Sequence, residues 1–322
     1  MTISFKRFLT AFLFGLVAST IFLEMPVLAA EDVSYLLTAA SKGDVATVNA
    51  MLASGASPNA KDEDGITALM YAARKDKAVV VLALINKGAD INAKDNGGWT
   101  PLMFAAKKNN IASVKVLLDK GADPKVRDSA GWSAFGIAAV SGFSQTVDLL
   151  VKHGVDVNTK SDDGKTVLMY AVKSGDIATV TTLLDNKANV LAQDGFGRSA
   201  LMIAAREGHA PVVELLVRYA GAVSQKDVSK WTALTWAVKK SQLEAAKILI
   251  AAGADVNNLD SEGTPLLHIA VNNGNKDMVN LLLENKARVK AKDQYGLTAL
   301  VYALKGQHTE IVQLIKAAGG SY

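Results

Sequence analysis

The tripeptide Gly164-Lys165-Thr166 has the residue types that close a phosphate-binding loop, in which backbone N–H groups and a lysine hold phosphate oxygens. A complete loop has another glycine five residues before this one, and the sequence has Thr159 there. The tripeptide also falls at a turn position that recurs along the chain. It therefore predicts a turn, and neither a nucleotide site nor a small-molecule substrate is expected.

The side chains that bind metals or transfer protons are scattered along the sequence. Cysteine is absent, which excludes a thiolate nucleophile, a zinc–thiolate site and a disulfide framework. The histidines fall in separate segments and form neither a metal cluster nor a general base with a partner: His153, His209, His268 and His308. The clustered aspartates lack the spaced oxygen ligands of a calcium loop: Asp62, Asp64, Asp162 and Asp163. We therefore expect a protein that is not an enzyme, without catalytic residues, metal or cofactor.

Methionine recurs at one position of a repeated segment, as Met70, Met103, Met169 and Met202. Thioethers bind cuprous ion, which is one interpretation of this column. Stacked helix pairs lie roughly 10 Å apart, however, so methionines of neighbouring units could not share an ion directly. The interpretation that we favour is that flexible methionine side chains fill gaps in a core.

Aromatic residues recur with a basic residue three positions later, a spacing that puts both side chains on one helical face within reach of a cation–π contact. The pairs are Tyr71 with Arg74, Phe104 with Lys107, Tyr170 with Lys173, Trp236 with Lys239, and Tyr302 with Lys305. Stacked units would align them into a basic, aromatic ridge suited to an acidic protein surface, an extended acidic peptide or an anionic glycan. A base in the last helical turn also stabilises the helix by roughly 0.3–1 kcal/mol without any ligand. Both interpretations are open.

Three of the four tryptophans share one position, directly after a recurring turn glycine: Trp99, Trp132 and Trp231. In two other units the same position carries Lys165 and Arg198. Exposed tryptophan is a common binding anchor, but packing between neighbouring hairpins would explain the column equally well. The candidate partner-binding residues are therefore Trp99, Trp132, Trp231, Lys165, Arg198, Arg74, Phe104, Lys107, Tyr170, Lys173, Trp236 and Lys239.

The composition limits the kinds of partner. Half of the 322 residues are hydrophobic, which argues against disorder. The 35 basic and 31 acidic residues leave a formal net charge of only +4. So small a charge on so long a chain does not imply a nucleic-acid partner or an anionic membrane. We expect a protein partner with an acidic surface, and nucleic acid is not favoured.

The first 30 residues have the layout of a secretory signal peptide. Lys6 and Arg7 precede an apolar run over residues 8–23, and small residues allow cleavage after Ala29 or Ala30. An uncleaved membrane anchor is the alternative, but the run is shorter than the roughly 20 residues that span a bilayer. We expect a bacterial-type protein that is periplasmic or secreted, with membrane contact only if the signal is retained.

The elements that carry these columns repeat every 33 residues. Alanine occupies one position nine times without exception: Ala39, Ala72, Ala105, Ala138, Ala171, Ala204, Ala237, Ala270 and Ala303. Within one unit, residues 101–108 and 111–120 have helical spacing, and Gly121 then ends the second helix. Neither helix can bury its apolar face inside so short a unit, so the units must stack into a solenoid.

On these residues the chain resembles the ankyrin-repeat family. The stretches that carry the resemblance are GWTPLMFAA at 98–106, GITALMYAA at 65–73, EGTPLLHIA at 262–270, and the endings GADINAKD at 88–95 and GADVNNLD at 253–260. The resemblance implies an all-α ankyrin-repeat solenoid of stacked helix-turn-helix units with hairpin-like loops. It covers residues 31–322 as about nine units, including two terminal caps.

The resemblance also implies a function. The hairpin tips and the exposed side of the first helices would line a concave face that binds a partner, so we expect a monomeric, non-catalytic scaffold or adaptor for protein–protein interaction. An effector acting on a host or neighbouring-cell target is the alternative, and a binder of anionic glycan or nucleic acid is less favoured.

The sequence departs from the family pattern in two ways that affect local structure. Thr264 and Pro265 sit one place early, which suggests a turn one residue shorter in that unit. Lys187, Ala220 and Lys286 replace the glycine that follows the second helix. A left-handed conformation costs a non-glycine residue roughly 1 kcal/mol, so we expect these three units to be locally weaker unless their loops differ in shape.

Overall fold

The computed structural model describes residues 32–322. The predicted signal peptide, with its cleavage residues Ala29 and Ala30, lies outside the described residues. The chain divides into two compact units, Met1–Ala134 and Phe135–Tyr322. No helix within residues 32–322 is long and apolar enough to cross a membrane.

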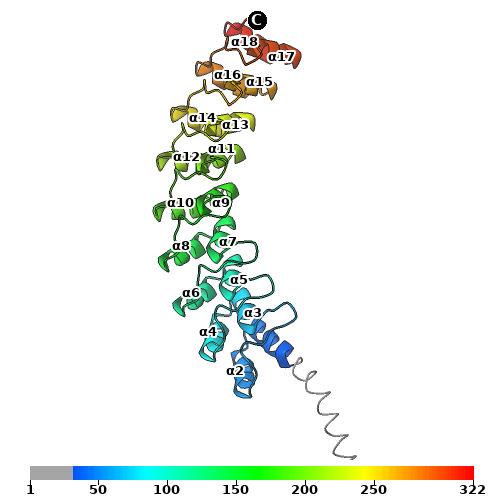
Figure 1. Ribbon diagram of the computed structural model, residues 1–322, viewed down its shortest axis with the longest axis vertical. Coiled ribbons are helices and arrows are strands. Elements are labelled where there is room, and N and C mark those ends of the chain that lie inside the picture. The colour runs from blue at the N-terminus through cyan, green and yellow to red at the C-terminus, as the bar shows by residue number, and fades with distance from the viewer. Residues whose placement is uncertain (1–31) are drawn as a thin grey trace, which may run out of the picture. The chain divides into compact units, whose positions relative to one another are not determined.

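The first unit is a stack of helix pairs (Figure 1). Residues 32–42 form its first helix. The helices that follow are α2 (Val45–Ala53), α3 (Ala68–Arg74), α4 (Ala78–Asn86), α5 (Pro101–Lys107) and α6 (Ile111–Asp119). Helix α3 packs on α5 in one row, while α2, α4 and α6 pack successively in the other.

The second unit continues the pattern. Helix α7 (Ala134–Val140) begins with the last residue of the first unit. The others are α8 (Ser144–Lys152), α9 (Val167–Ser174), α10 (Ile177–Asp185), α11 (Ala200–Glu207), α12 (Ala210–Arg218), α13 (Ala233–Lys239), α14 (Leu243–Ala251), α15 (Leu266–Asn272), α16 (Lys276–Glu284), α17 (Ala299–Lys305) and α18 (Thr309–Ala317). Helices α9, α11, α13, α15 and α17 form one row, and α8 through α18, even numbers, form the second (Figure 1).

The alanine column lies where neighbouring first helices meet. Ala72, Ala105, Ala204 and Ala237 are all fully buried, in the row where α3 contacts α5 and α11 contacts α13. A larger side chain at this position would separate the two helices, which is why every unit has alanine there. The prediction of an all-α ankyrin-repeat solenoid is confirmed, since the extended segments among residues 32–322 form only isolated antiparallel bridges.

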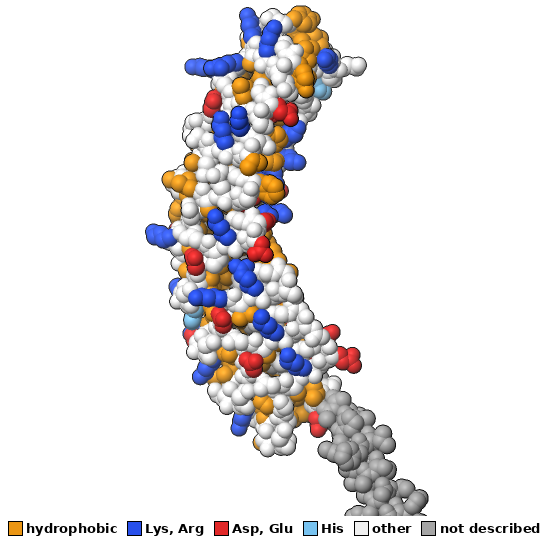
Figure 2. Space-filling model, viewed as in Figure 1, with side chains coloured by type: hydrophobic (Ala, Val, Ile, Leu, Met, Phe, Trp, Pro, Cys, Tyr) orange, Lys and Arg blue, Asp and Glu red, His pale blue; other side chains and the backbone are white. Residues whose placement is uncertain are grey.

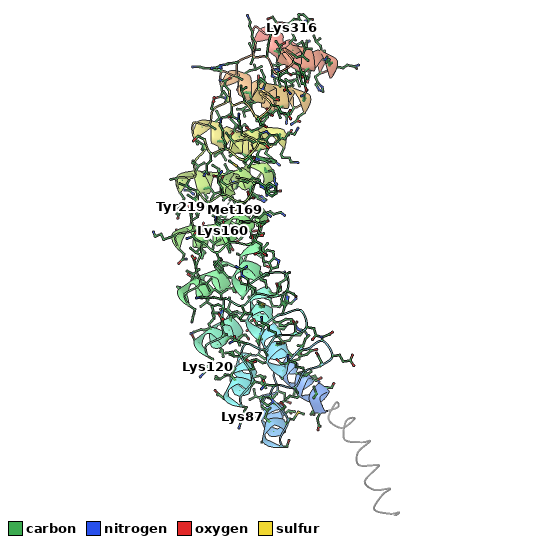
Figure 3. All side chains as sticks on the ribbon, viewed as in Figure 1. Lys87, Lys120, Lys160, Met169, Tyr219 and Lys316 are labelled. Atoms are coloured by element: carbon green, nitrogen blue, oxygen red, sulfur yellow. The ribbon has the colours of Figure 1, made fainter. Side chains whose placement is uncertain are left out.

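The methionines of the repeated column are buried, and Met70 takes part in capping the start of its first helix. Met70, Met103 and Met169 are at most 1% exposed, and Met169 lies inside the helix stack of the second unit (Figure 3). Thr67 at the start of α3 accepts the N–H of Met70, and in return the Thr67 N–H donates to the Met70 Sδ at 3.4 Å. The sulfur therefore takes the role of the side-chain acceptor in a capping box.

The predicted shorter turn before α15 is wrong. Asp260 accepts the N–H groups of Glu262 and Thr264, two and four residues later, as the aspartates of the other hairpins do. The turn keeps its length, and Pro265 simply occupies the position before the helix that threonine or serine occupies elsewhere. Proline has no N–H, and the Nδ1 of buried His268 has no hydrogen-bond partner.

The loops after the second helices keep the same shape when glycine is missing. Lys187, Ala220 and Lys286 have φ angles of 69°, 62° and 67°, in the left-handed region. The alternative of differently shaped loops is therefore excluded for these three positions. Lys230, which replaces a turn glycine, has a φ of 60°.

Candidate protein-binding surface

An aspartate at the base of most of the described hairpins fixes the shape of the hairpin tip. In the hairpin before α13, Asp227 Oδ1 accepts the N–H groups of Ser229 and Trp231, each at 2.9 Å. The same pair of bonds, to residues two and four positions later, is made by Asp62, Asp95, Asp128, Asp194, Asp260 and Asp293. Because the carboxylate satisfies these donors, the tip residues hold a fixed outward orientation.

Neighbouring tips are joined by backbone hydrogen bonds. In the first unit Asn96 N–H donates to the Asp64 carbonyl at 3.0 Å. In the second unit Val228 N–H donates to the Phe196 carbonyl at 3.1 Å, and Ser261 N–H donates to the Ser229 carbonyl at 3.0 Å. Within each unit the tips thus form a continuous edge, so side chains from successive repeats can contact one partner together.

The aromatic residues of the first helices tie these helices to the hairpin aspartates. Tyr71 Oη donates to Asp62 Oδ2 at 3.0 Å, and Tyr302 Oη donates to Asp293 Oδ2 at 2.5 Å. The hydrogen bond to Asp293 and burial raise the pKa of Tyr302 to about 12. Tyr170 Oη donates to Ser161 Oγ at 3.2 Å, where serine replaces the aspartate. The tyrosine hydroxyl groups are therefore engaged in hydrogen bonds within their own repeats. Only the exposed parts of the rings remain available for contact with a partner.

The expected cation–π pairs form in only some repeats. Arg74 lies 4.7 Å from the ring centre of Tyr71, and Lys305 lies 6.0 Å from that of Tyr302. The rings of Phe104 and Trp236 lie instead under Arg74 and Arg206 of the preceding repeats, at 6.0 and 5.7 Å. Tyr170 lies 5.8 Å from Lys165 of its own hairpin. A cation from the preceding repeat can reach these rings because stacking brings adjacent first helices together.

The lysines of the expected ridge end the first helices and face solvent. Lys107, Lys173 and Lys239 lie in the last turns of α5, α9 and α13 and are exposed. Within residues 32–322 none of the three forms an ion pair with a carboxylate. Their position complements the helix dipole and also leaves three ammonium groups available to an acidic partner.

Trp99 and Trp231 pack against the next aromatic residue of their own repeat. The rings of Trp99 and Phe104 lie 5.3 Å apart, and those of Trp231 and Trp236 lie 4.7 Å apart in an edge-to-face arrangement. Trp236 Nε1 donates to Asp227 Oδ2 at 2.9 Å. Trp132, half-buried, donates its backbone N–H to Asp128 at 2.8 Å. Packing within the repeat is therefore established, and each tryptophan remains half-buried rather than hidden.

Hollows lie on both sides of the Trp231–Trp236 pair. One, of about 280 Å³, is lined by Trp231 and Lys239 together with Thr264, Glu262 and Asn272. The other, of about 430 Å³, is lined by Arg206, Glu207, Trp236, Lys240 and Gln242. The first lies between two adjacent hairpins and the first helices α13 and α15 behind them.

The sequence matches the family described as "Ankyrin repeats (3 copies)" over residues 36–128, 120–194, 187–260 and 252–321. The chain belongs to the ankyrin-repeat family. A comparison with curated proteins gives no match. The chain is similar to a crystal structure of the human ASB11 ankyrin repeat domain, with a TM-score of 0.63 and 24% identity over 70% of this chain and 100% of that one. At this identity the similarity shows the fold. Ankyrin repeats generally mediate protein–protein interaction and are typically non-catalytic.

The remaining predicted contact residues of this ankyrin-repeat chain are engaged within their own hairpins. Arg198 forms an ion pair with Asp194 at 2.8 Å and lies 4.7 Å from the ring centre of Phe196. Lys165 forms an ion pair with Asp163. The bonds from Lys165 and Ser161 lower the pKa of Asp163 to about 2. Among the described residues, histidine, aspartate and glutamate form no group of three that could hold a metal.

Exposed apolar residues at the ankyrin hairpins were not identified from the sequence. Phe196, Val228, Leu259 and Tyr295 are 56%, 70%, 47% and 74% exposed. The sequence does contain an indication of them, because each of these apolar residues falls in or beside a turn where other repeats have polar or small residues. Phe196 and Tyr295 share one repeat position, but Val228 and Leu259 fall at two others, so the four residues do not form a single column. On the face drawn in Figure 2, basic and acidic side chains are interspersed within each unit.

Proposed function

We propose that this chain is an exported, non-catalytic scaffold that binds a protein through the groove between its hairpins and first helices. The observation that supports this most directly is the hollow beside Trp231, where an indole, side-chain hydrogen-bonding groups and a lysine that forms no ion pair with residues 32–322 converge. A rigid groove loses little conformational entropy on binding, so its contacts contribute more fully to affinity.

The partner that we propose has an acidic surface, and the chain acts as a monomer in the periplasm or outside the cell. Lys107, Lys173 and Lys239 are the exposed charges that would steer such a partner. Long-range attraction between exposed charges is screened by salt, so the complex should weaken as ionic strength rises. The apolar run and small residues of the first 30 positions support export.

The test is crosslinking in intact cells, followed by identification of the captured protein and its binding to the purified chain. Photoreactive residues placed at positions 107, 173 and 239 should capture the same partner, whereas one placed at Val79, exposed on second helix α4, should not. Binding should weaken at high salt and in the Lys107→Ala, Lys173→Ala, Lys239→Ala triple variant. Equal binding at low and high salt and by the triple variant would exclude these lysines as the contact site. Capture from position 79 alone would place the partner on the second-helix side and contradict the proposal.

A further inference from the structure

Among residues 32–322, exposed large apolar side chains at the hairpins occur only in the second unit. At the hairpin tips of the first unit the side chains are polar or small: Glu63, Asp64, Asn96, Gly97, Ser129 and Ala130. In the second unit Phe196 and Val228 occupy successive tips, 56% and 70% exposed. The 3.1 Å bond from Val228 N–H to the Phe196 carbonyl shows that these two tips adjoin. Exposure of two neighbouring apolar side chains to water is unfavourable, and such a patch commonly marks a site that a partner covers.

Both tips are held in place before any partner arrives. The Arg198 guanidinium lies over the Phe196 ring and is itself held by two bonds to Asp194, from Nε at 2.9 Å and Nη2 at 2.8 Å. Asp194 is buried. In the next hairpin, Asp227 holds the Trp231 N–H and the Trp236 indole together. Anchors that are already ordered bind at a smaller entropic cost than flexible ones.

The hollow beside Trp231, between its hairpin and the next one, presents hydrogen-bond donors that have no partner among the described residues. Trp231 Nε1 makes no hydrogen bond to any residue between 32 and 322, in contrast to Trp236 Nε1. The Lys239 ammonium lines the same hollow and forms no ion pair with the described residues. Donors of this kind fit a carboxylate. Asp260 and Glu262 line the hollow as well. Asp260 accepts the backbone N–H groups of its own hairpin, and both negative charges disfavour a ligand carboxylate on their side of the hollow, which gives the bound segment a direction.

We propose that the Trp231 site, composed of Phe196, Val228, Trp231 and Lys239, is the main anchor point of the chain and binds an extended protein segment that presents a large apolar side chain next to Asp or Glu. The apolar side chain packs on the two tips and on Trp231, and the carboxylate accepts from Trp231 Nε1 and Lys239. An apolar anchor favours a peptide over an anionic glycan. The inference rests on the proposed function and deepens it, because it assigns the binding energy to two repeats.

The probe is a library of random dodecapeptides displayed on phage and selected on the full chain. Selected sequences should place Asp or Glu within two residues of Phe, Leu, Trp or Met. A labelled synthetic peptide of the consensus should bind Trp231→Ala at least about tenfold more weakly, the size of effect typical of an interface anchor. Val228→Ser should also weaken binding, and Lys239→Gln should weaken it and reduce its salt dependence.

The matched control is Val79→Ser, because Val79 is 67% exposed, close to the 70% of Val228, but lies on second helix α4. The Val79→Ser variant should bind the consensus peptide as tightly as the unaltered chain does. Val228→Ser removes an exposed side chain, so it keeps the test valid if Trp231→Ala fails to fold. Trp99→Ala should weaken peptide binding less than Trp231→Ala does. Equal losses of affinity in the two variants would overturn the assignment of the site to these repeats.

Three other results would overturn the inference. These are consensus peptides without acidic residues, peptides that bind Trp231→Ala and Val228→Ser as tightly as the unaltered chain, and no enriched peptide at all. Trp231-dependent binding of heparin oligosaccharides without peptide binding would assign the site to an anionic glycan instead. None of these results would refute the wider proposal of a protein scaffold, which the crosslinking experiment tests separately.

Discussion

Trp236 Nε1 donates a hydrogen bond to Oδ2 of Asp227, nine residues earlier, at 2.9 Å. The other oxygen of this carboxylate accepts two backbone N–H groups of the hairpin. One buried side chain therefore connects the hairpin that carries Trp231 to helix α13. Stability and binding are coupled in this repeat, because the bonds that order the hairpin also orient its exposed residues.

Asp227→Ala should destabilise the chain more than Asp95→Ala. Both changes remove two bonds to hairpin N–H groups, but only Asp227 also accepts from an aromatic donor, since Phe104 has none to offer Asp95. An unsatisfied buried donor costs roughly 1–3 kcal/mol, so we expect losses of about 3 and about 2 kcal/mol in the free energy of unfolding. Urea unfolding monitored by circular dichroism measures both. Equal losses would show that the Trp236 bond contributes nothing to stability.

Pro265→Thr should stabilise helix α15. Threonine would supply the side-chain acceptor for the His268 N–H and the backbone N–H that His268 Nδ1 lacks. A threonine cap is worth roughly 1 kcal/mol, and loss of proline's restriction of the unfolded chain offsets part of it. The new hydrogen bond to His268 Nδ1 adds to the capping gain, so we expect a net increase of about 1 kcal/mol in the free energy of unfolding. The reverse change, Thr67→Pro at the start of α3, should destabilise the chain, and a gain there would contradict the argument.

His268 should make the stability of the chain sensitive to mildly acidic pH. Burial lowers the pKa of this histidine from its ordinary 6.5, and the ring is fully buried with Nε2 3.0 Å from the Leu297 carbonyl. Below pH 6.5 the unfolded chain takes up a proton that the folded chain does not, so stability falls as the pH falls from 6.5 toward the lowered value. His268→Met, which introduces the residue of the other repeats, removes this contribution. The difference in unfolding free energy between the two chains should change by up to about 1.4 kcal/mol per pH unit below 6.5 and stay constant above it. A constant difference from pH 8 to pH 5 would refute the assignment.

The mature chain should begin at Ala30 or Glu31. Lys6 and Arg7, the apolar run and the small residues before Glu31 form the layout that signal peptidases process. Intact-mass measurement of the chain recovered after expression should show loss of the first 29 or 30 residues from the 33.9 kDa precursor. Replacing Ala29 and Ala30 with phenylalanine should leave the precursor unprocessed. An unaltered chain recovered at full mass would instead favour a retained anchor.

The repeat made the fold predictable. Alanine at nine equivalent positions and glycine after most second helices report one packing contact and one backbone conformation many times over, so chance agreement is excluded. The same logic located the methionines in the core. It did not reveal that Met70 and Met202 accept N–H groups through sulfur, because a column of residue types does not specify which atoms meet.

The candidate surface was only partly predictable, for a geometric reason. Helical spacing correctly pairs Tyr71 with Arg74, but Arg206 lies over Trp236 because two repeats approach in space, a contact that sequence spacing within one unit does not contain. The early Thr264 and Pro265 predict a shorter turn that does not form, because the hydrogen bonds of Asp260 keep the same spacing as in the other hairpins. Phe196 and Val228 were overlooked because they lie at different positions of adjacent tips.

Replacing Lys286 with glycine should stabilise the chain. Lys286 has a φ of 67°, a conformation that costs a side chain roughly 1 kcal/mol and costs glycine little. Lys187→Gly and Ala220→Gly should act in the same direction, because both residues also have positive φ angles. We expect about 0.5–1 kcal/mol from each, read from urea unfolding. Lys120→Gly is the matched control, because Lys120 precedes a glycine at the same loop but has a φ of −94°. That change should give no gain, since it only increases the freedom of the unfolded chain. Similar gains at Lys120 and Lys286 would show that the left-handed conformation is not the source of the weakness.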